Sequence, residues 1–369
     1  MMIGYMYLLL CVFAPFLFFP PPVLAERVDI GGKIGQMLMV GFRGCDVDEE
    51  SAIVKDIRAG RVGGVILFDY DVPSKSPVRN ISSPAQVRKL VRTLKEASTA
   101  PLFVAVDQEG GKVCRLKERF GFPPSLSEGY LGRRDNVEET GKAAEITAQT
   151  LRELGINLNF APVVDLNVNP ENPIIGKIER SFSSDPACVI RHAEAMIDAF
   201  HAGGVLSAIK HFPGHGSSTA DSHKGFVDVT RTWSARELEP FAALTESGKA
   251  DMVMTAHIVN EHLDPRWPAT LSRAIIGGIL RRDLGYEGVV ISDDMQMGAI
   301  RLHYGLEQAV ERAITAGCDI LIFGNNSVYD EGIASRAGAI IRELVHEGRV
   351  QAERIDQSYT RIMKLKKRL

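Results

Sequence analysis

The chain has 369 residues, of which 45% are hydrophobic and 24% charged, with a formal net charge of −3. This is an ordinary soluble globular composition, long enough for one large domain or two smaller ones. The 43 Lys and Arg are interspersed with 46 Asp and Glu, so no long-range basic field would steer a polyanion and we expect no nucleic-acid partner.

The first 25 residues contain no charged side chain and centre on the apolar run YMYLLLCVFAPFLFF. Val23 and Ala25 stand at the small-residue positions of a cleavage site, which favours a secretory signal followed by one domain over residues 26–369. An uncleaved membrane anchor is the competing interpretation, because about 20 apolar residues can span a bilayer. We therefore expect export to the periplasm or the exterior, or association with a membrane through this segment; a cytoplasmic protein with a misassigned start is the remaining alternative.

The four cysteines after the leader region are far apart and lack the spacing of metal ligands: Cys45, Cys114, Cys188 and Cys318. They do not resemble a disulfide framework, although one bridge could form after export. We expect no metal site, no cofactor and a monomer.

Past residue 33, short apolar runs rich in β-formers alternate with helical stretches. Most of these runs lack the polar alternation of a half-exposed strand, which is typical of parallel strands buried on both faces. We count eight of them: Ile34–Phe42, Val62–Phe68, Pro101–Asp107, Ile156–Asp165, Val205–His211, Asp251–Ile258, Gly288–Asp293 and Asp319–Gly324.

The helical stretches begin at recognisable start signals: Ser83-Pro84, Asp185-Pro186 and the capping-box pattern Ser234-x-x-Glu237. Eight strand–helix units predict a single α/β domain folded as a (β/α)8 TIM-type barrel with enlarged βα loops. The alternative is an open doubly wound sheet. Polar residues follow nearly every strand, whereas an open sheet gathers them at one switch point, and this favours the barrel.

Residues 210–223, KHFPGHGSSTADSH, are the segment richest in candidate catalytic groups. Small and polar residues separate a Lys-His pair from Asp221-Ser222-His223, which predicts a mobile loop. In an extended segment residues i and i+2 point to the same side, so Asp221 can accept from one ring nitrogen of His223. That contact would fix the tautomer and raise the imidazole pKa, as a proton donor and acceptor near neutrality requires.

The carboxyl ends of the other strands also carry polar groups, which a barrel would bring to one rim. Many donors and acceptors without a phosphate-binding loop suit a polyhydroxylated ligand such as a sugar. Glycoside cleavage needs an acid and, in most enzymes, a carboxylate at the anomeric carbon; His223 on the loop and Asp293 on a rigid strand fit these roles. The expected pocket contains Asp107, Arg115, Arg180, Lys210, His211, His257 and Asp293.

These residues together resemble glycoside hydrolase family 3, specifically its β-N-acetylhexosaminidase branch of peptidoglycan-recycling glucosaminidases. The resemblance covers nearly all of the chain after residue 33. Its landmarks are Asp107-x-Glu-Gly-Gly-x-Val-x-Arg115, Arg180-Ser-Phe, Lys210-His-Phe-Pro-Gly-His-Gly, Asp221-Ser-His223, Pro268-Ala-Thr-Leu-Ser272 and Gly288-Val-Val-Ile-Ser-Asp293.

The resemblance implies a retaining double displacement with Asp293 as nucleophile and His223 as acid/base, oriented by Asp221. It also implies that the terminal N-acetylglucosamine of peptidoglycan fragments or chitooligosaccharides is bound without a cofactor. The residues implied in binding are Asp107, Arg115, Arg180, Lys210 and His211.

Two other functions stay open. A phosphorylase of the same family is one, because a histidine acid/base avoids the repulsion that a glutamate would exert on phosphate. A metal-dependent amidohydrolase on the same barrel is the other, since imidazoles and a carboxylate can hold zinc. That enzyme class wants a His-x-His at the first strand, where this chain has Val40-Gly41-Phe42-Arg43.

Overall fold

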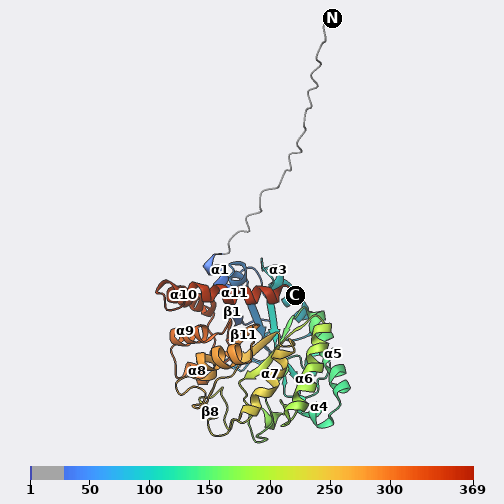
Figure 1. Ribbon diagram of the computed structural model, residues 1–369. Helices are drawn as coiled ribbons and strands as arrows, with labels where there is room; N and C mark the ends of the chain where they lie inside the picture. Colours follow the sequence, from blue (N-terminus) through green and yellow to red (C-terminus); the bar gives the residue numbers. More distant parts are fainter. Residues whose placement is uncertain (2–28) are drawn as a thin grey trace.

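The computed structural model describes Met1 and residues 29–369, and the interpretation of residues 1–25 therefore lies outside the described residues. Its centre is a closed barrel of eight parallel strands in the order β1-β12-β11-β9-β7-β6-β3-β2 (Figure 1). The strands are β1 Leu38–Gly41, β2 Gly64–Leu67, β3 Phe103–Val106, β6 Leu158–Asn159, β7 Leu206–Phe212, β9 Met252–Thr255, β11 Val289–Asp294 and β12 Ile320–Phe323.

Each of the eight apolar runs supplies one barrel strand, so the predicted (β/α)8 fold is confirmed. The first predicted strand, Ile34–Phe42, was wrong in part. Residues 34–36 belong to helix α1 (Ile30–Gln36), and strand β1 begins only at Leu38. Asp29 caps this helix, its carboxylate accepting from the N–H of Gly32. The fourth run is also mostly irregular, with β6 limited to two residues.

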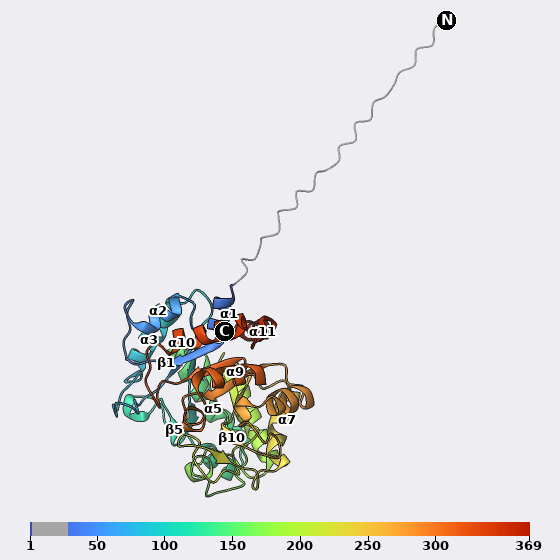
Figure 2. The same cartoon turned by 90° about the vertical axis from the view of Figure 1, so that its left-hand side faces the viewer.

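Helices surround the barrel and follow the strands in sequence (Figures 1 and 2). The α-helices are α2 Ala52–Arg58, α3 Pro84–Glu96, α4 Glu128–Arg134, α5 Val137–Leu154, α6 Pro186–Ala202, α7 Glu239–Glu246, α8 Gly298–Arg301, α9 Leu306–Ala316, α10 Ile333–His346 and α11 Ala352–Lys366. Short 3-10 turns occur at η1 Glu118–Phe120, η2 Gly176–Ile178, η3 Ala235–Leu238 and η4 Ala269–Leu271, and η5 Ala274–Asp283 is a π-helix.

Two of the three predicted helix starts are confirmed. Ser83 and Asp185 cap α3 and α6 by accepting backbone N–H groups of the first turn, with proline at the start of each helix. The capping box at Ser234 was wrong, because the Ser234 side chain makes no capping hydrogen bond. The Glu237 carboxylate instead accepts from the backbone N–H groups of Gly216 and Ser217, at 3.0 and 3.3 Å.

The amino end of the barrel is closed by α1 and α11, which lie together at that end in both views. The Lys366 ammonium is buried there and donates to Gln36 Oε1 and to the carbonyl of Gly63, at 2.6 and 2.7 Å. Arg354 of α11 donates to the buried carboxylate of Asp319, at the start of β12. The C-terminal helix thus ties the first strands of the barrel to the last.

The carboxyl end carries long loops and two small sheets. The antiparallel hairpin β4 Gln108–Gly110 and β5 Val113–Cys114 follows β3, and β8 Val227–Asp228 pairs with β10 Ile258–Val259. Figure 2 shows β5 and β10 at the end of the molecule opposite α11. Among the described residues no helix combines the length and apolarity needed to cross a membrane. Cys45, Cys114, Cys188 and Cys318 are free thiols.

Candidate active site

A cavity of about 690 Å³ opens at the carboxyl end of the barrel, within the range of roughly 300–1,000 Å³ that is usual for small-ligand sites. It brings together side chains from seven of the eight barrel strands and the loops that follow them. Two candidate residues lie outside this lining: His257, and Asp221, which lies behind His223. The predicted residues that line the cavity are Asp107, Arg115, Arg180, Lys210, His211, His223 and Asp293.

One wall of the cavity is a network of paired charges. Lys210 of β7 is buried and contacts Asp107 at 2.9 Å and Glu109 at 2.6 Å. Arg180 donates to both Glu109 oxygens, at 2.7 and 2.8 Å, and Arg115 reaches Asp107 at 3.3 Å. Two carboxylates therefore hold three cations in fixed places at the cavity wall, where they can donate hydrogen bonds to ligand oxygens.

The charges of this network stabilise one another. Burial alone would raise the pKa of Asp107, but Lys210 and Arg115 outweigh burial and hold it below the usual value. Burial likewise opposes ionisation of Lys210, whose pKa is nevertheless raised by Asp107 and Glu109. Asp107, Glu109, Lys210 and Arg180 are therefore ionised near neutral pH.

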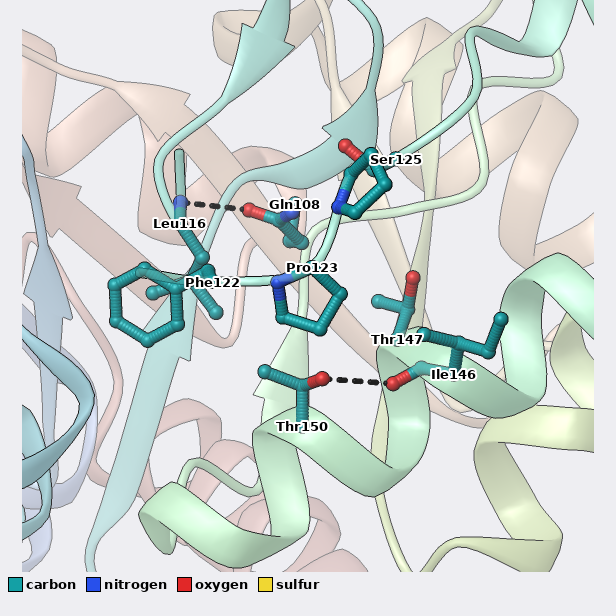
Figure 3. Close-up of a pocket in the computed structure, with 9 residues that line it drawn as sticks. Gln108, Leu116, Phe122, Pro123, Ser125, Ile146, Thr147 and Thr150 are labelled. Carbon is teal, nitrogen blue, oxygen red and sulfur yellow. Dashed lines mark hydrogen bonds between the residues drawn. The ribbon is translucent and has the colours of Figure 1, made fainter. Parts of the chain in front are cut away.

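The β4–β5 hairpin places Arg115 at the cavity. Gln108 is the first residue of β4, and its side-chain Oε1 accepts from the backbone N–H groups of Arg115 and Leu116 at 3.1 and 2.9 Å. Figure 3 shows Gln108 reaching toward Leu116 above helix α5, among Phe122, Pro123 and Thr147. Gln108 thus supports the hairpin from behind while Asp107 and Glu109 face the cavity.

His211 is oriented by a buried carboxylate on the neighbouring segment. Asp165 Oδ2 contacts His211 Nδ1 at 2.6 Å, while Asp165 Oδ1 accepts the backbone N–H groups of His211 and His215. His211 Nε2 then faces Arg180 Nη2 at 3.2 Å. The peptide bonds Lys210–His211 and Phe212–Pro213 are cis.

The Asp221–His223 pair forms as predicted. Asp221 Oδ1 contacts His223 Nδ1 at 2.8 Å and also accepts the backbone N–H of His223, which leaves Nε2 free to face a ligand. The hydrogen bond from Asp221 raises the pKa of His223, burial opposes this, and the charge of Asp293 adds to the rise. His223 is therefore a cationic acid over more of the neutral range than a free imidazole.

The loop that carries His223 has two parts. Residues 211–218 are buried, whereas the His223 side chain, on the arm of residues 219–226, is 59% exposed. The arm rests on α8, where the backbone N–H groups of Gly298 and Ala299 donate to the carbonyls of His223 and Ser222 at 3.1 Å each. Mobility of the loop stays a prediction for the exposed arm, whereas its base is held by Asp165 and Glu237.

Asp293 lies at the end of β11. Burial alone would raise its pKa, but the imidazoles of His257, His211 and His223 outweigh burial and lower it, so the carboxylate is ionised. Its Oδ1 accepts from the N–H of Asp294 at 2.7 Å. Asp294 is engaged with β12, accepting from the N–H of Gly324 at 2.9 Å, and burial raises its pKa to about 6.

Three contributors to this site were not among the predicted catalytic or sugar-binding residues. Glu109 was visible as half of an acidic pair, and Asp165 as a strand end, but neither pattern showed what the carboxylate would contact. His257 was placed at the pocket, yet it is fully buried behind Asp293, with Nε2 against the Asp294 carbonyl at 2.9 Å and Nδ1 against Thr270 Oγ1 at 2.8 Å.

One cluster among the described residues has groups that could hold a metal ion: Asp135, Cys188 and His192. It lies on the outer helices α4 to α6, away from the cavity. Asp135 Oδ1 already accepts from Arg191 at 3.0 Å and contacts His192 Nε2 at 3.2 Å. The carboxylate that a metal ion would need is therefore already paired with the Arg191 guanidinium.

The matching family model and two similar relatives indicate the same kind of enzyme. Residues 29–365 match the family model described as the glycosyl hydrolase family 3 N terminal domain. A beta-hexosaminidase of Tolumonas auensis is 37% identical over 306 residues, covering 82% of this chain and 84% of the relative. Beta-hexosaminidase A of Pseudoalteromonas piscicida is 35% identical, covering 84% of this chain and 54% of its own length.

Solved structures similar to this chain indicate the same family. The family 3 beta-N-acetylglucosaminidase from Paenibacillus sp. str. FPU-7 has a TM-score of 0.83 and 37% identity over 92% of this chain, which spans 62% of that protein. Beta-N-acetylhexosaminidase from Beutenbergia cavernae has a TM-score of 0.80 and 30% identity, covering 92% of this chain and 99% of its own. These matches confirm the family resemblance and set aside the metal-dependent amidohydrolase.

Proposed function

The chain belongs to glycoside hydrolase family 3, and from that premise we propose that it is a retaining exo-β-N-acetylhexosaminidase. Its substrates are peptidoglycan fragments or chitooligosaccharides, from which it releases terminal β-linked N-acetylglucosamine. The observation that carries the proposal is that Asp293 and the Asp221-held His223 meet at one cavity.

In the first step the ionised Asp293 attacks the anomeric carbon while His223 Nε2–H gives its proton to the departing glycosidic oxygen. The bond from carbon to the leaving group breaks, and an ester to Asp293 forms. The lowered pKa of Asp293 and the raised pKa of His223 give each group the protonation state that this step needs at neutral pH.

In the second step His223 acts as a base. Formation of the ester removes the negative charge of Asp293, which is one of the causes that raise the His223 pKa, so the imidazole becomes easier to deprotonate once the intermediate exists. A water molecule then gives a proton to His223 and attacks the anomeric carbon, and the ester bond to Asp293 breaks.

The paired charges hold the terminal sugar. Asp107 offers an acceptor to sugar hydroxyls, and Arg115, Arg180 and Lys210 offer donors from the same wall, beside His211. Because Glu109 holds Arg180 and Lys210, and Asp165 holds His211, these side chains lose little entropy when the sugar binds.

Turnover of aryl β-N-acetylglucosaminides tests the function, with aryl β-glucosides as the competing substrate. The proposal expects N-acetylglucosamine to be released with its anomeric configuration retained, as followed by proton NMR, from both muropeptides and chitin oligomers. Efficient cleavage of plain glucosides together with failure on N-acetylglucosaminides would refute the substrate assignment.

Two variants test the catalytic assignment. Asp293→Ala should abolish turnover, because no other carboxylate can form the ester. Asp294→Ala is the matched control, since its carboxylate is engaged by Gly324 and activity should persist. A silent Asp293→Ala beside an inactive Asp294→Ala would show that the nucleophile is the adjacent residue.

The acceptor and the location have tests of their own. Water is the proposed acceptor, and formation of a sugar 1-phosphate only when inorganic phosphate is present would instead identify the phosphorylase alternative. Export is proposed from the uncharged apolar residues 1–25. Amino-terminal sequencing of the purified protein should then find a chain that begins near Glu26.

A further inference from the structure

Glu237 is a fully buried carboxylate that the chemistry above does not use. It lies on η3, just beyond the loop that carries His223, and its Oε2 accepts the backbone N–H groups of Gly216 and Ser217. Within residues 29–369 no Lys, Arg or His forms an ion pair with it. Burying an uncompensated carboxylate is costly, so its place under the loop calls for an explanation.

The loop closes tightly over this side chain. Gly214 has φ +118°, and a Cβ there would lie 2.5 Å from the Cβ of Glu237. Trp233, from the same segment as Glu237, donates its indole N–H to the carbonyl of Pro213 at 3.1 Å. The first half of the loop therefore sits on a platform made by residues 233–237.

A chain of hydrogen bonds leads from this platform to the catalytic imidazole. His215 lies directly before the turn held by Glu237; its Nδ1 contacts Ser218 Oγ at 2.5 Å and its Nε2 contacts Ser222 Oγ at 3.3 Å. Burial lowers the pKa of His215 to about 4, so the ring is neutral and bridges the two hydroxyls as one donor and one acceptor. Ser222 directly precedes His223.

We propose that Glu237 is a positioning residue for catalysis, which holds the Gly216–Ser217 turn and, through His215 and Ser222, sets the place of His223 relative to Asp293. The inference rests on the proposed function and adds to it a residue that touches neither substrate nor reacting atoms. Glu237 accepts from two N–H groups of the loop, so its replacement releases the Gly216–Ser217 turn, whereas Lys210 and His211 keep their own partners Glu109 and Asp165.

The substitution series follows from the geometry. Glu237→Gln keeps an oxygen that can accept from both N–H groups. Glu237→Asp keeps the carboxyl group, but its side chain is one methylene shorter and cannot hold both. Glu237→Ala removes the acceptor. Glu239→Ala is the matched control, because Glu239 begins the next helix and its carboxylate is 54% exposed.

The readout uses the leaving group, because proton donation by His223 matters only when the departing oxygen is a poor leaving group. We compare kcat/KM, which reports the first chemical step, for a dinitrophenyl and a methyl β-N-acetylglucosaminide. Glu237→Ala and Glu237→Asp should lose about 10- to 100-fold on the methyl glycoside, since misplacement by about 1 Å can cost roughly 10² in rate. Loss on the dinitrophenyl glycoside should be less than about threefold. Glu237→Gln and Glu239→Ala should stay near wild type on both.

Failure of the positioning role and failure of the proposed function give different results. Equal losses on both substrates, or no loss in Glu237→Asp and Glu237→Ala, would overturn the positioning role while leaving the proposed function in place. If Glu237→Ala does not fold, Glu237→Asp and Glu237→Gln decide by the same comparison. A wild-type protein that cleaves neither substrate would refute the proposed function, and this inference with it.

Discussion

A substitution at Gly298 tests how closely the arm that carries His223 must pack against α8. A Cβ at this position would lie 2.6 Å from the carbonyl oxygen of His223, 2.9 Å from the carbonyl carbon of Lys224 and 3.1 Å from the nitrogen of Gly225. All three atoms belong to the backbone, so no side-chain rotation can relieve the contact. Ordinary contact begins at 3.4 Å, and the arm must therefore move by roughly 0.8 Å, the difference between 3.4 and 2.6 Å.

A displacement of this size should cost activity more than stability. A misplacement of about 1 Å can lower a rate by roughly 10², and we expect Gly298→Ala to lower kcat/KM on an alkyl β-N-acetylglucosaminide by about 10- to 100-fold. The accompanying loss in free energy of unfolding should be about 1–3 kcal/mol, the usual cost of overpacking.

Steady-state kinetics and urea unfolding of the same preparations measure both effects. Gly141→Ala is the matched control, because Gly141 lies within α5 and a Cβ there meets nothing within 4 Å. It should keep full activity and gain slight stability. A Gly298→Ala enzyme within about twofold of wild type would show that the contact between the arm and α8 does not place His223.

Two further predictions concern pH and stability. Asp221→Asn removes the carboxylate that raises the pKa of His223, so the imidazole should lose its proton at lower pH. The basic limb of the plot of kcat/KM against pH should therefore move to lower pH. An unmoved limb would mean that another group is the acid. Asp319→Ala removes a fully buried acceptor of several arginine and serine donors and should lower the free energy of unfolding by about 3–5 kcal/mol, measured by urea titration. Asp356→Ala, which breaks an ion pair whose carboxylate is 57% exposed, should cost no more than about 1 kcal/mol, and equal losses in the two variants would contradict the assigned role of Asp319.

The barrel could be predicted because each strand is buried on both faces and carries its own apolar run. The first and last residues of the strands could be predicted less well. Residues 34–36 continue the apolar run of the first strand, yet they belong to a helix that begins at Ile30 and is capped by Asp29. Hydrophobicity alone does not distinguish the two states in so short a segment.

The meeting of Asp293 and His223 at one cavity could be predicted, because Asp293 stands where a strand ends and Asp221 and His223 are neighbours in sequence. The supporting residues could not, because their partners are distant in the chain. Asp165 meets His211 only after β6 and β7 are paired. Glu237 fits a capping pattern, but the N–H groups that it satisfies belong to a loop twenty positions earlier; local spacing does not reveal which unsatisfied N–H groups a carboxylate will find.

The pairing of β1 with β12 and the contact of Lys366 with Gln36 and Gly63 have a consequence for biosynthesis. The first strand emerges from the ribosome nearly three hundred residues before its last neighbour, and the lysine that completes the barrel floor arrives later still. The ring cannot shut before β12 has been synthesised, so β1 stays without one of its two neighbours while all the intervening strands are made.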